Sequence, residues 1–332
     1  MDTASVFSRA LGIEVPLICG AMYPCSNPEL VAAVSAAGGI GIVQPLSLTY
    51  VHGYEFREGL RYIRRLTGKP IGVNLIIERS SGKYLARARQ WLEIALEEQV
   101  PFIVTALGDP RWVVQCAAPA GVTVYHDVTG REHALKALDG GVDGFICVNN
   151  RAGGHAGRLS PQQLLDDLGP LGKPLICAGG IGTAAEFAQA VAMGYAGAQL
   201  GTRFIATTEC TAHDDYKQAI IAAGAADIVL SEKISGVPVS IIGTPSVERT
   251  GVHAGPLAKR LLRGQRTKHW MRLLYTLQSV WKLKRAALQG GAYRGIFQAG
   301  KSVEGIHALL PAADIVAQYA AALQSRQAAS ER

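Results

Sequence analysis

The chain has 332 residues, of which 48% are hydrophobic and 18% are charged. This composition excludes a disordered chain and is sufficient for one large barrel-type domain or two ordinary domains. No run of about 18 uncharged apolar residues occurs, and the first residues lack a basic region followed by an apolar core, so we expect a cytoplasmic protein with no membrane span and no signal peptide.

Eight short apolar runs follow one another along the first two thirds of the sequence. Most of them are apolar throughout instead of alternating, which is typical of strands that are covered on both faces. Each run is therefore expected to form one strand. The runs are 17–22, 40–45, 71–77, 102–107, 123–128, 144–149, 174–181 and 197–204.

Segments with helical spacing separate these runs, and several of them begin on a capping residue and end on glycine. Asn27, Ser160 and Thr183 are the capping residues. Eight alternations of strand and helix, with 208–224 as the eighth helix, predict an α/β fold, the (β/α)8 TIM barrel. A doubly wound open sheet is the alternative fold.

The regular alternation stops after about residue 205. We predict that residues 1–228 form the barrel, that 229–295 form an inserted helical cap or substrate domain, and that 296–332 return to the barrel. The cap is basic, because 249–301 contains twelve Lys or Arg and no Asp or Glu. Such a surface favours an acidic carrier protein, a coenzyme A thioester or a membrane surface as partner, although a solvated helix face also explains it. No nucleic-acid-binding motif accompanies the charge, so no nucleic-acid partner is expected.

Six cysteines are scattered along the chain without a CxxC pair or the His/Cys spacing of a metal site. Several lie in the apolar runs, where a free thiol packs as a small hydrophobic side chain. We therefore expect a reducing compartment and no structural metal. The sequence leaves the oligomeric state open.

In a (β/α)8 barrel the catalytic and binding groups lie on the loops that follow the strands. The seventh run contains Gly179 and Gly180, and the eighth contains Gly201 and Thr202. Backbone N–H groups at such glycine turns commonly bind phosphate in this fold. These four residues are the candidate phosphate site, and the alternative is that the glycines serve only tight turns.

A histidine surrounded by glycines follows the sixth run, in the sequence NNRAGGHAGRLSP at 149–161. Gly153 and Gly154 allow a ligand to approach the backbone closely, and His155 can exchange protons near neutral pH. His155 is the candidate catalytic residue, with a satisfied loop histidine as the alternative. Arg151 is a candidate anchor for an anionic substrate or a phosphate, unless it faces solvent.

Other titratable residues are weaker candidates. His133 and His213 lie on expected helices and are interpreted as surface residues, and His126 is also a weaker candidate than His155. Asp127, at the end of the fifth run, is either a second acid–base group or a carboxylate that stabilises a loop.

Five motifs together resemble the nitronate monooxygenase (2-nitropropane dioxygenase) family, which is related to the flavin-dependent enoyl-acyl carrier protein reductases. The motifs are PLICGAM near the start, KPIGVNL, AGGHAG, the long block PLICAGGIGTAAEFAQAVAMGYAGAQLGTRF, and QAGKS. The resemblance runs from about residue 16 to about residue 305, with gaps in the cap. The long block is its most specific part.

The resemblance implies an FMN-binding barrel with His155 as the active-site histidine. Met22 would offer a soft surface to the flavin ring and Asn74 a hydrogen bond to its edge, with core packing and loop capping as the alternatives for these two residues. The implied cofactor-binding residues are Gly20, Ala21, Met22, Asn74, Gly153, Gly154, Gly179, Gly180, Gly201 and Thr202.

Three positions depart from the pattern of the family. Arg151 stands where glutamate is frequent, Asp127 where some relatives carry lysine, and Lys301 where glutamine is frequent. These departures surround the implied flavin and substrate and lie outside the phosphate cradle. Arg151, Lys301 and Ser302 are therefore the candidate substrate-binding residues.

Three functions compete at this point. The leading one is FMN-dependent oxidation of alkyl nitronates with O2 to a carbonyl compound and nitrite. The alternative is an NAD(P)H-dependent FMN reductase of quinones or enoyl thioesters, which the basic cap and Arg151 favour. The third is a non-catalytic flavin- or phosphate-binding protein whose cap docks a partner.

Overall fold

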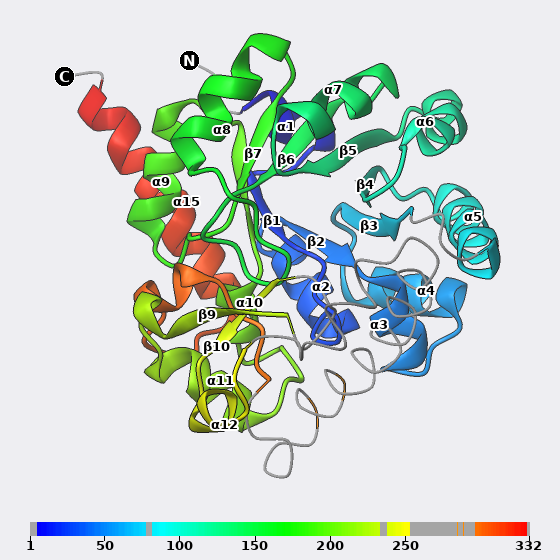
Figure 1. Cartoon of the computed structure of the whole chain (residues 1–332). Helices are drawn as coiled ribbons and strands as arrows, with labels where there is room; N and C mark the ends of the chain where they lie inside the picture. The colour runs from blue at the N-terminus through cyan, green and yellow to red at the C-terminus, as the bar shows by residue number, and fades with distance from the viewer. Residues whose placement is uncertain are drawn as a thin grey trace, which may run out of the picture.

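The computed structural model describes residues 5–77, 82–232, 238–252, 284, 288 and 296–330. Eight parallel strands form a closed barrel in chain order, and β8 closes the ring by pairing with β1 (Figure 1). The predicted (β/α)8 barrel is confirmed, and the open sheet is excluded. The strands are β1 (Leu17–Cys19), β2 (Ile40–Val43), β3 (Ile71–Ile76), β4 (Phe102–Ala106), β5 (Thr123–Val128), β6 (Gly144–Val148), β7 (Leu175–Ala178) and β8 (Gly197–Leu200).

Most of the helices alternate with these strands and cover the outside of the barrel. Ser160 and Thr183 form capping boxes, as expected for helix starts, whereas Asn27 occupies its capping position but bonds instead to the backbone of Glu209 and Thr211. The helices are α1 (Val6–Leu11), α2 (Pro28–Ala36), α3 (Pro45–Tyr50), α4 (Phe56–Leu66), α5 (Gly82–Glu97), α6 (Arg111–Ala117), α7 (Arg131–Asp139), α8 (Pro161–Leu168), α9 (Ala184–Met193), α10 (Thr202–Ile205), α11 (Asp214–Ala222), α12 (Pro245–Thr250) and α15 (Ala312–Ser330).

The eighth helix of the barrel is α15, not the segment 208–224 that the sequence predicted. α15 packs against α9 and α2, the helices that flank β8 and β1, and runs beside α9 in Figure 1. Its Tyr319 ring lies 5.3 Å from the ring of Phe187 on α9. The prediction was wrong because α11, inside 208–224, has helical spacing but lies beyond the barrel, near β9 and β10 (Figure 1).

The barrel interior is apolar and is closed at one end by α1. Ile18, Ile42 and Ile146 belong to a buried cluster formed by inward-facing strand residues. Phe7 of α1 inserts between Phe102 and Tyr125, with ring centroids 5.7 and 5.5 Å away. Because α1 fills the end where the strands begin, a ligand can reach the interior only from the end where they finish.

The described part of the predicted cap contains strands as well as a helix. β9 (Ile228–Ser231) and β10 (Val239–Ile242) pair as a two-stranded antiparallel sheet, and α12 follows them. The sequence analysis did not predict this sheet. Most of the predicted helical cap, with most of the basic segment, falls outside the described residues, so the division into barrel, cap and returning segment stays a prediction.

In the described part of the chain, no helix is long and apolar enough to cross a membrane. Within the same residues, no group of three or more His, Cys, Asp or Glu is placed to hold a metal ion.

Candidate functional site

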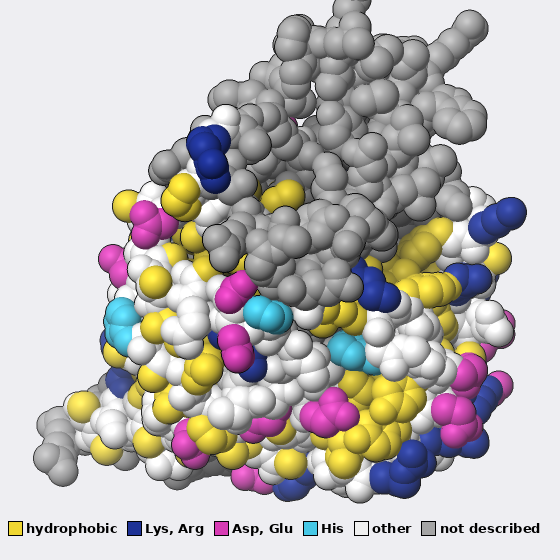
Figure 2. Space-filling view, turned by 90° about the horizontal axis from the view of Figure 1, so that it is seen from below, with side chains coloured by type: hydrophobic (Ala, Val, Ile, Leu, Met, Phe, Trp, Pro, Cys, Tyr) yellow, Lys and Arg dark blue, Asp and Glu magenta, His cyan; other side chains and the backbone are white. Residues whose placement is uncertain are grey.

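The predicted site residues converge at the end of the barrel where the strands finish. Figure 2 views the molecule from the side that carries β9 and β10, and acidic and basic side chains are interspersed over its described surface. The loops after β6, β7 and β8 meet there with the 3-10 helix η5 (Lys301–Gly305). The segments that carry the motifs are therefore neighbours in space.

The backbone of the loop after β6, which carries His155, is fixed by contacts with β10 and with Gly300. The backbone N–H of Ser240 on β10 donates to the carbonyl of Gly154 over 2.8 Å. A Cβ added to Gly153 would lie 2.9 Å from the backbone N of Gly300, which shows how closely these two backbones pack. The His155 side chain is exposed to solvent, yet desolvation by the surrounding protein lowers its pKa. A pKa below the ordinary value of a histidine favours the neutral form of the His155 imidazole.

The loops after β6 and β7 interlock at glycines. Gly179 and Gly180 have φ values of 119° and 77°, which favour glycine. A Cβ on Gly179 would lie 2.5 Å from Oδ1 of Asn149, and one on Gly180 would lie 2.4 Å from Nε of Arg151. Asn149 ties the two loops together, because its Nδ2 donates to the carbonyl of Gly179 over 2.9 Å and its Oδ1 accepts from the N–H of Arg151 over 2.8 Å.

The loops after β1 and β8 meet beside this pair. A Cβ on Gly201 would lie 3.5 Å from Sδ of Met22, an ordinary contact distance. The buried hydroxyl of Thr202 accepts a hydrogen bond from the N–H of Gly300 over 3.0 Å. Gly300 thus joins the loop after β8 to the loop after β6, which puts the four candidate phosphate residues in one cluster with QAGKS.

The remaining candidates occupy the edges of this cluster. Gly20 donates its N–H to the carbonyl of Leu200 over 2.9 Å, and Ala21 packs on the apolar barrel interior. The N–H of Lys301 donates to the carbonyl of Arg151 over 2.9 Å, and Ser302 is buried against Gly182. The substrate candidates Arg151, Lys301 and Ser302 are therefore close together in space.

Three polar side chains line the inside of the barrel near its open end. Asn74, Asp127 and Gln199 alternate along β3, β5 and β8 with residues that pack on the outer core, so they face inward. Nδ2 of Asn74 donates weakly to the carbonyl of Val104, over 3.4 Å. Side-chain carbons of Gln199 lie about 3 Å from where a Cβ on Gly20 would stand. Sequence reasoning missed Gln199, although its place inside the long family block was a usable signal.

Asp127 is an unusual carboxyl group. Among the described residues, its buried Oδ1 has no hydrogen-bond partner. Burial raises the pKa of Asp127 to about 7, so this carboxyl is partly protonated at neutral pH. A carboxylate that stabilises a loop would accept hydrogen bonds from that loop, and Oδ1 accepts none among the described residues, so the geometry favours the interpretation of Asp127 as a second acid–base group.

The other titratable candidates lie away from the cluster. His126 faces the outer core, where its Nδ1 is 2.8 Å from Oγ1 of Thr105, and burial lowers its pKa to about 4. His133 pairs with Thr129 on the surface of α7. His213 caps α11 by accepting from the N–H of Asp215. These contacts are structural.

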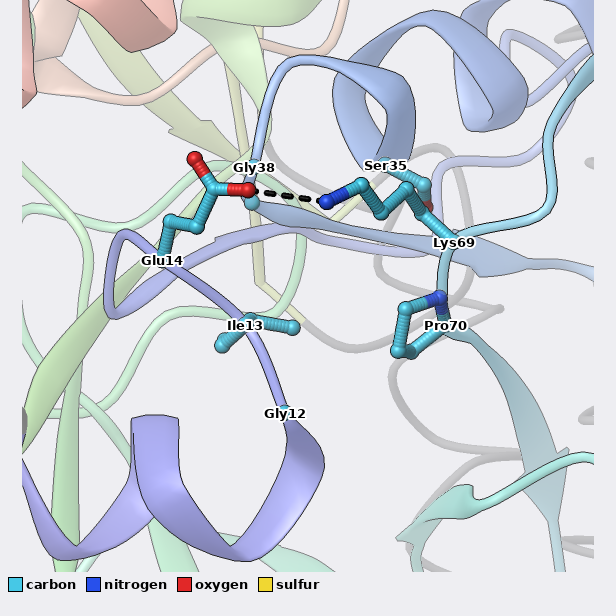
Figure 3. Close-up of a pocket in the computed structure, with 8 residues that line it drawn as sticks. Gly12, Ile13, Glu14, Ser35, Gly38, Lys69 and Pro70 are labelled. Carbon is cyan, nitrogen blue, oxygen red and sulfur yellow. Dashed lines mark hydrogen bonds and ion pairs between the residues drawn. The ribbon is translucent and has the colours of Figure 1, made fainter.

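A shallow pocket at the opposite end of the barrel is also separate from the site (Figure 3). Gly12, Gly38 and Pro70, which line it, precede β1, β2 and β3. An ion pair of 2.8 Å between Lys69 and Glu14 crosses it. Lys69 and Pro70, which begin the motif KPIGVNL, line the pocket, but it lies at the end of the barrel opposite to His155 and the glycine turns, so it is not the candidate site.

Comparison with known proteins identifies the family. Residues 4–321 match the family described as nitronate monooxygenase. The chain belongs to this family. A nitronate monooxygenase of Paraburkholderia phytofirmans is 30% identical over 269 residues, which cover 68% of this chain and 73% of that protein.

Two further relatives match over greater shares of the chain. A protein of Rhodococcus jostii named (3aS,4S,5R,7aS)-5-hydroxy-7a-methyl-1-oxo-octahydro-1H-indene-4-carboxyl-CoA dehydrogenase is 26% identical over 325 residues, 90% of each chain. The solved structure of FabK from Thermotoga maritima superimposes with a TM-score of 0.81 at 26% identity and covers 99% of both chains. The relatives are named as a monooxygenase and a dehydrogenase, so this family member is an oxidoreductase.

Proposed function

We propose that the chain is an FMN-dependent oxidoreductase that acts on the thioester of an acyl group, with coenzyme A as the expected carrier. The observation that carries the proposal is His155: its backbone is fixed by β10 and QAGKS, its side chain reaches solvent, and its lowered pKa favours the neutral imidazole. A neutral histidine suits removal of a proton from the carbon beside a thioester carbonyl.

FMN fits the residues that the loops bring together. Gly179 and Gly180 adopt conformations and close contacts that a side chain would disrupt, and the backbone N–H groups of this turn would bind the phosphate. Gly201 and Thr202 would complete the phosphate site. Met22 and the inward-facing Asn74 would hold the ring, with Gly20, Ala21, Gly153 and Gly154 allowing close approach. When bound, FMN supplies a two-electron acceptor or donor beside the substrate.

The residues of the chain supply the proton chemistry and the orientation. His155 would take the proton from the carbon next to the thioester carbonyl in the oxidative direction and return it in the reductive direction. The rigid loop backbone keeps the imidazole in one place, so little reorganisation is needed before the proton moves. Lys301 provides positive charge beside the site, which favours a substrate that carries phosphates.

The oxidation of alkyl nitronates with O2 is the second candidate, and it is favoured by the family match and the 30% identical relative. A nitronate is already an anion, so His155 would hold its oxygens as a donor instead of removing a proton. NAD(P)H belongs to the thioester function only: NAD(P)H would reduce the flavin in the reductive direction, and its oxidised form NAD(P)+ would reoxidise the flavin in the oxidative direction.

One spectroscopic experiment tests the proposal. The purified chain would be mixed anaerobically in turn with a saturated acyl-CoA, NADH, NADPH and propionate-3-nitronate while the flavin absorbance is followed. We expect bleaching by the acyl-CoA or by a pyridine nucleotide. Bleaching by the nitronate alone, followed by nitrite release in air, would replace the thioester function with the second candidate.

His155→Ala separates catalysis from binding. Loss of a general base lowers turnover by roughly 100- to 10,000-fold, and FMN content should stay unchanged. His133→Ala is the matched control, because His133 lies on the surface of α7. If His155→Ala retains full activity in every assay, His155 is not catalytic and a binding function gains support.

A further inference from the structure

Arg151 occupies a fixed position between the loops after β6 and β7. Its N–H donates to Oδ1 of Asn149 over 2.8 Å, and its carbonyl accepts from the N–H of Lys301 over 2.9 Å. Its side chain lies against Gly180, since a Cβ built there would be 2.7 Å from Cβ and 2.8 Å from Cδ of Arg151. The stem of the arginine therefore covers the glycine turn that is the candidate phosphate site.

Two carboxylates attract the guanidinium group without occupying its donors. Nη2 lies 4.0 Å from Oε1 of Glu186 and 3.7 Å from Oε2 of Glu304, distances that are too long for hydrogen bonds. The other oxygen of Glu186 is engaged by the N–H groups of Gly182 and Thr183 at the start of α9. Within the described ranges, no hydrogen-bond acceptor is in place for the guanidinium group of Arg151.

A half-buried guanidinium with unused donors is suited to an anion. The side chain of Arg151 is 35% exposed, and its Cβ, Cδ and Nε lie against Gly180. Guanidinium groups bind phosphate through two parallel hydrogen bonds, which neutral backbone N–H groups cannot match in strength. The adjacent glycine turn offers backbone donors to the same anion.

We propose that Arg151 binds the phosphate of FMN and thereby makes the site selective for FMN over riboflavin. This inference rests on the proposed function, because it assumes that the flavin phosphate lies at Gly179 and Gly180. It assigns Arg151 to the cofactor instead of the substrate. The alternative is that Arg151 only bridges the two loops to α9 and η5.

Flavin affinity distinguishes these roles, because riboflavin has the same ring as FMN but no phosphate. The full chain, stripped of flavin, would be titrated with each compound while the quenching of flavin fluorescence is followed. Arg151→Ala should weaken FMN binding by roughly 10- to 100-fold, the value of a charged hydrogen-bonded contact, and change riboflavin binding less than about twofold. The FMN affinity of Arg151→Lys should lie between those of the wild type and Arg151→Ala, because lysine keeps the positive charge but cannot make two parallel hydrogen bonds to the phosphate.

Glu304→Gln is the matched control on the same guanidinium. Glu304 is 63% exposed, and its loss removes a negative charge that competes for Arg151, so FMN affinity should stay equal or rise. An equal loss of FMN and riboflavin affinity in Arg151→Ala would show a bridging role and overturn the inference. Wild-type protein that binds riboflavin as tightly as FMN would also overturn it, while leaving the flavoenzyme function intact. Wild-type protein that binds neither compound would overturn both.

Discussion

The loops on the two sides of the barrel mouth are held in different ways. After β6 and β7, backbone packs on backbone or on buried side chains, and a single added Cβ at Gly179 or Gly300 would come within about 2.6 Å of neighbouring atoms. Along β5 and after β4, in contrast, one polar atom lacks a hydrogen bond and one residue has a strained backbone. Asp127 has a buried oxygen with no hydrogen-bond partner among the described residues. Leu107 is 58% exposed with a φ of 62°.

This difference indicates two kinds of task. A rigid, interlocked backbone suits the binding of one invariant group, such as the phosphate of a cofactor, because the backbone N–H donors are then fixed in place before the group binds. Strained or unpaired side chains lower stability and are retained where a ligand uses them. We therefore expect substitutions on the first side to destabilise the fold and substitutions on the second side to stabilise it.

The largest expected effect is on the interlocked side. Gly179→Ala should lower the free energy of unfolding by roughly 3–5 kcal/mol, because the new Cβ meets Asn149 and the backbone of Ala152 at a φ of 119°. Gly172→Ala is the control: its φ is 69° and nothing lies within 4 Å, so strain alone costs about 1 kcal/mol. Urea unfolding of the two variants measures this, and equal losses would contradict the interlock.

Asp127→Asn tests the other side through pH. The folded pKa of about 7 lies above the unfolded value, so the folded state holds the proton more tightly, and the wild type loses stability as pH rises from about 4 to 7. The variant lacks this loss and should be more stable by roughly 1–3 kcal/mol above pH 7, with the difference vanishing near pH 4. Urea unfolding at about pH 4.5, 6.0 and 7.5, which spans the range over which the wild type loses stability, provides the check. A difference independent of pH would mean that Asp127 is not buried as a carboxyl group.

The smallest effect is expected at Leu107. Leu107→Gly should raise the free energy of unfolding by roughly 0.5–1 kcal/mol, because glycine relieves the positive φ. Leu107→Ala keeps the strained backbone and should give no gain. Thermal unfolding of both variants measures the difference, and a shared gain would assign the effect to the exposed leucine side chain instead of the backbone.

The sequence was sufficient to predict the barrel and to place the candidate site residues at one end of it. Strands with apolar residues on both faces must be covered by other residues on both faces, as they are in a barrel. The run 123–128 therefore predicts β5 with its observed bounds. The glycine motifs fall at strand ends, and parallel strands bring their ends together. His155, Gly179 and Thr202 are therefore correctly placed at one end of the barrel by pattern alone.

The errors have a common physical cause, which is contact between segments distant in the sequence. Helical spacing in α11 and α15 is similar, and only packing against α9 and α2 shows which one covers the barrel. β10 is short and is stabilised by Gly154 and Phe297, far away along the chain. The partner of Arg151 in space is Gly180, and no local spacing connects them.

The position of α15 has a consequence for the newly made chain. The helix that covers β8 and β1 is translated only after residues 201–311, so the growing polypeptide exposes the apolar flanks of α2 and α9 while that whole stretch is synthesised. Ile315, Val316 and Tyr319 then bury those flanks. The barrel is therefore completed late during translation, and ribosome-bound chains that stop before residue 312 should remain sensitive to protease although all eight strands have emerged.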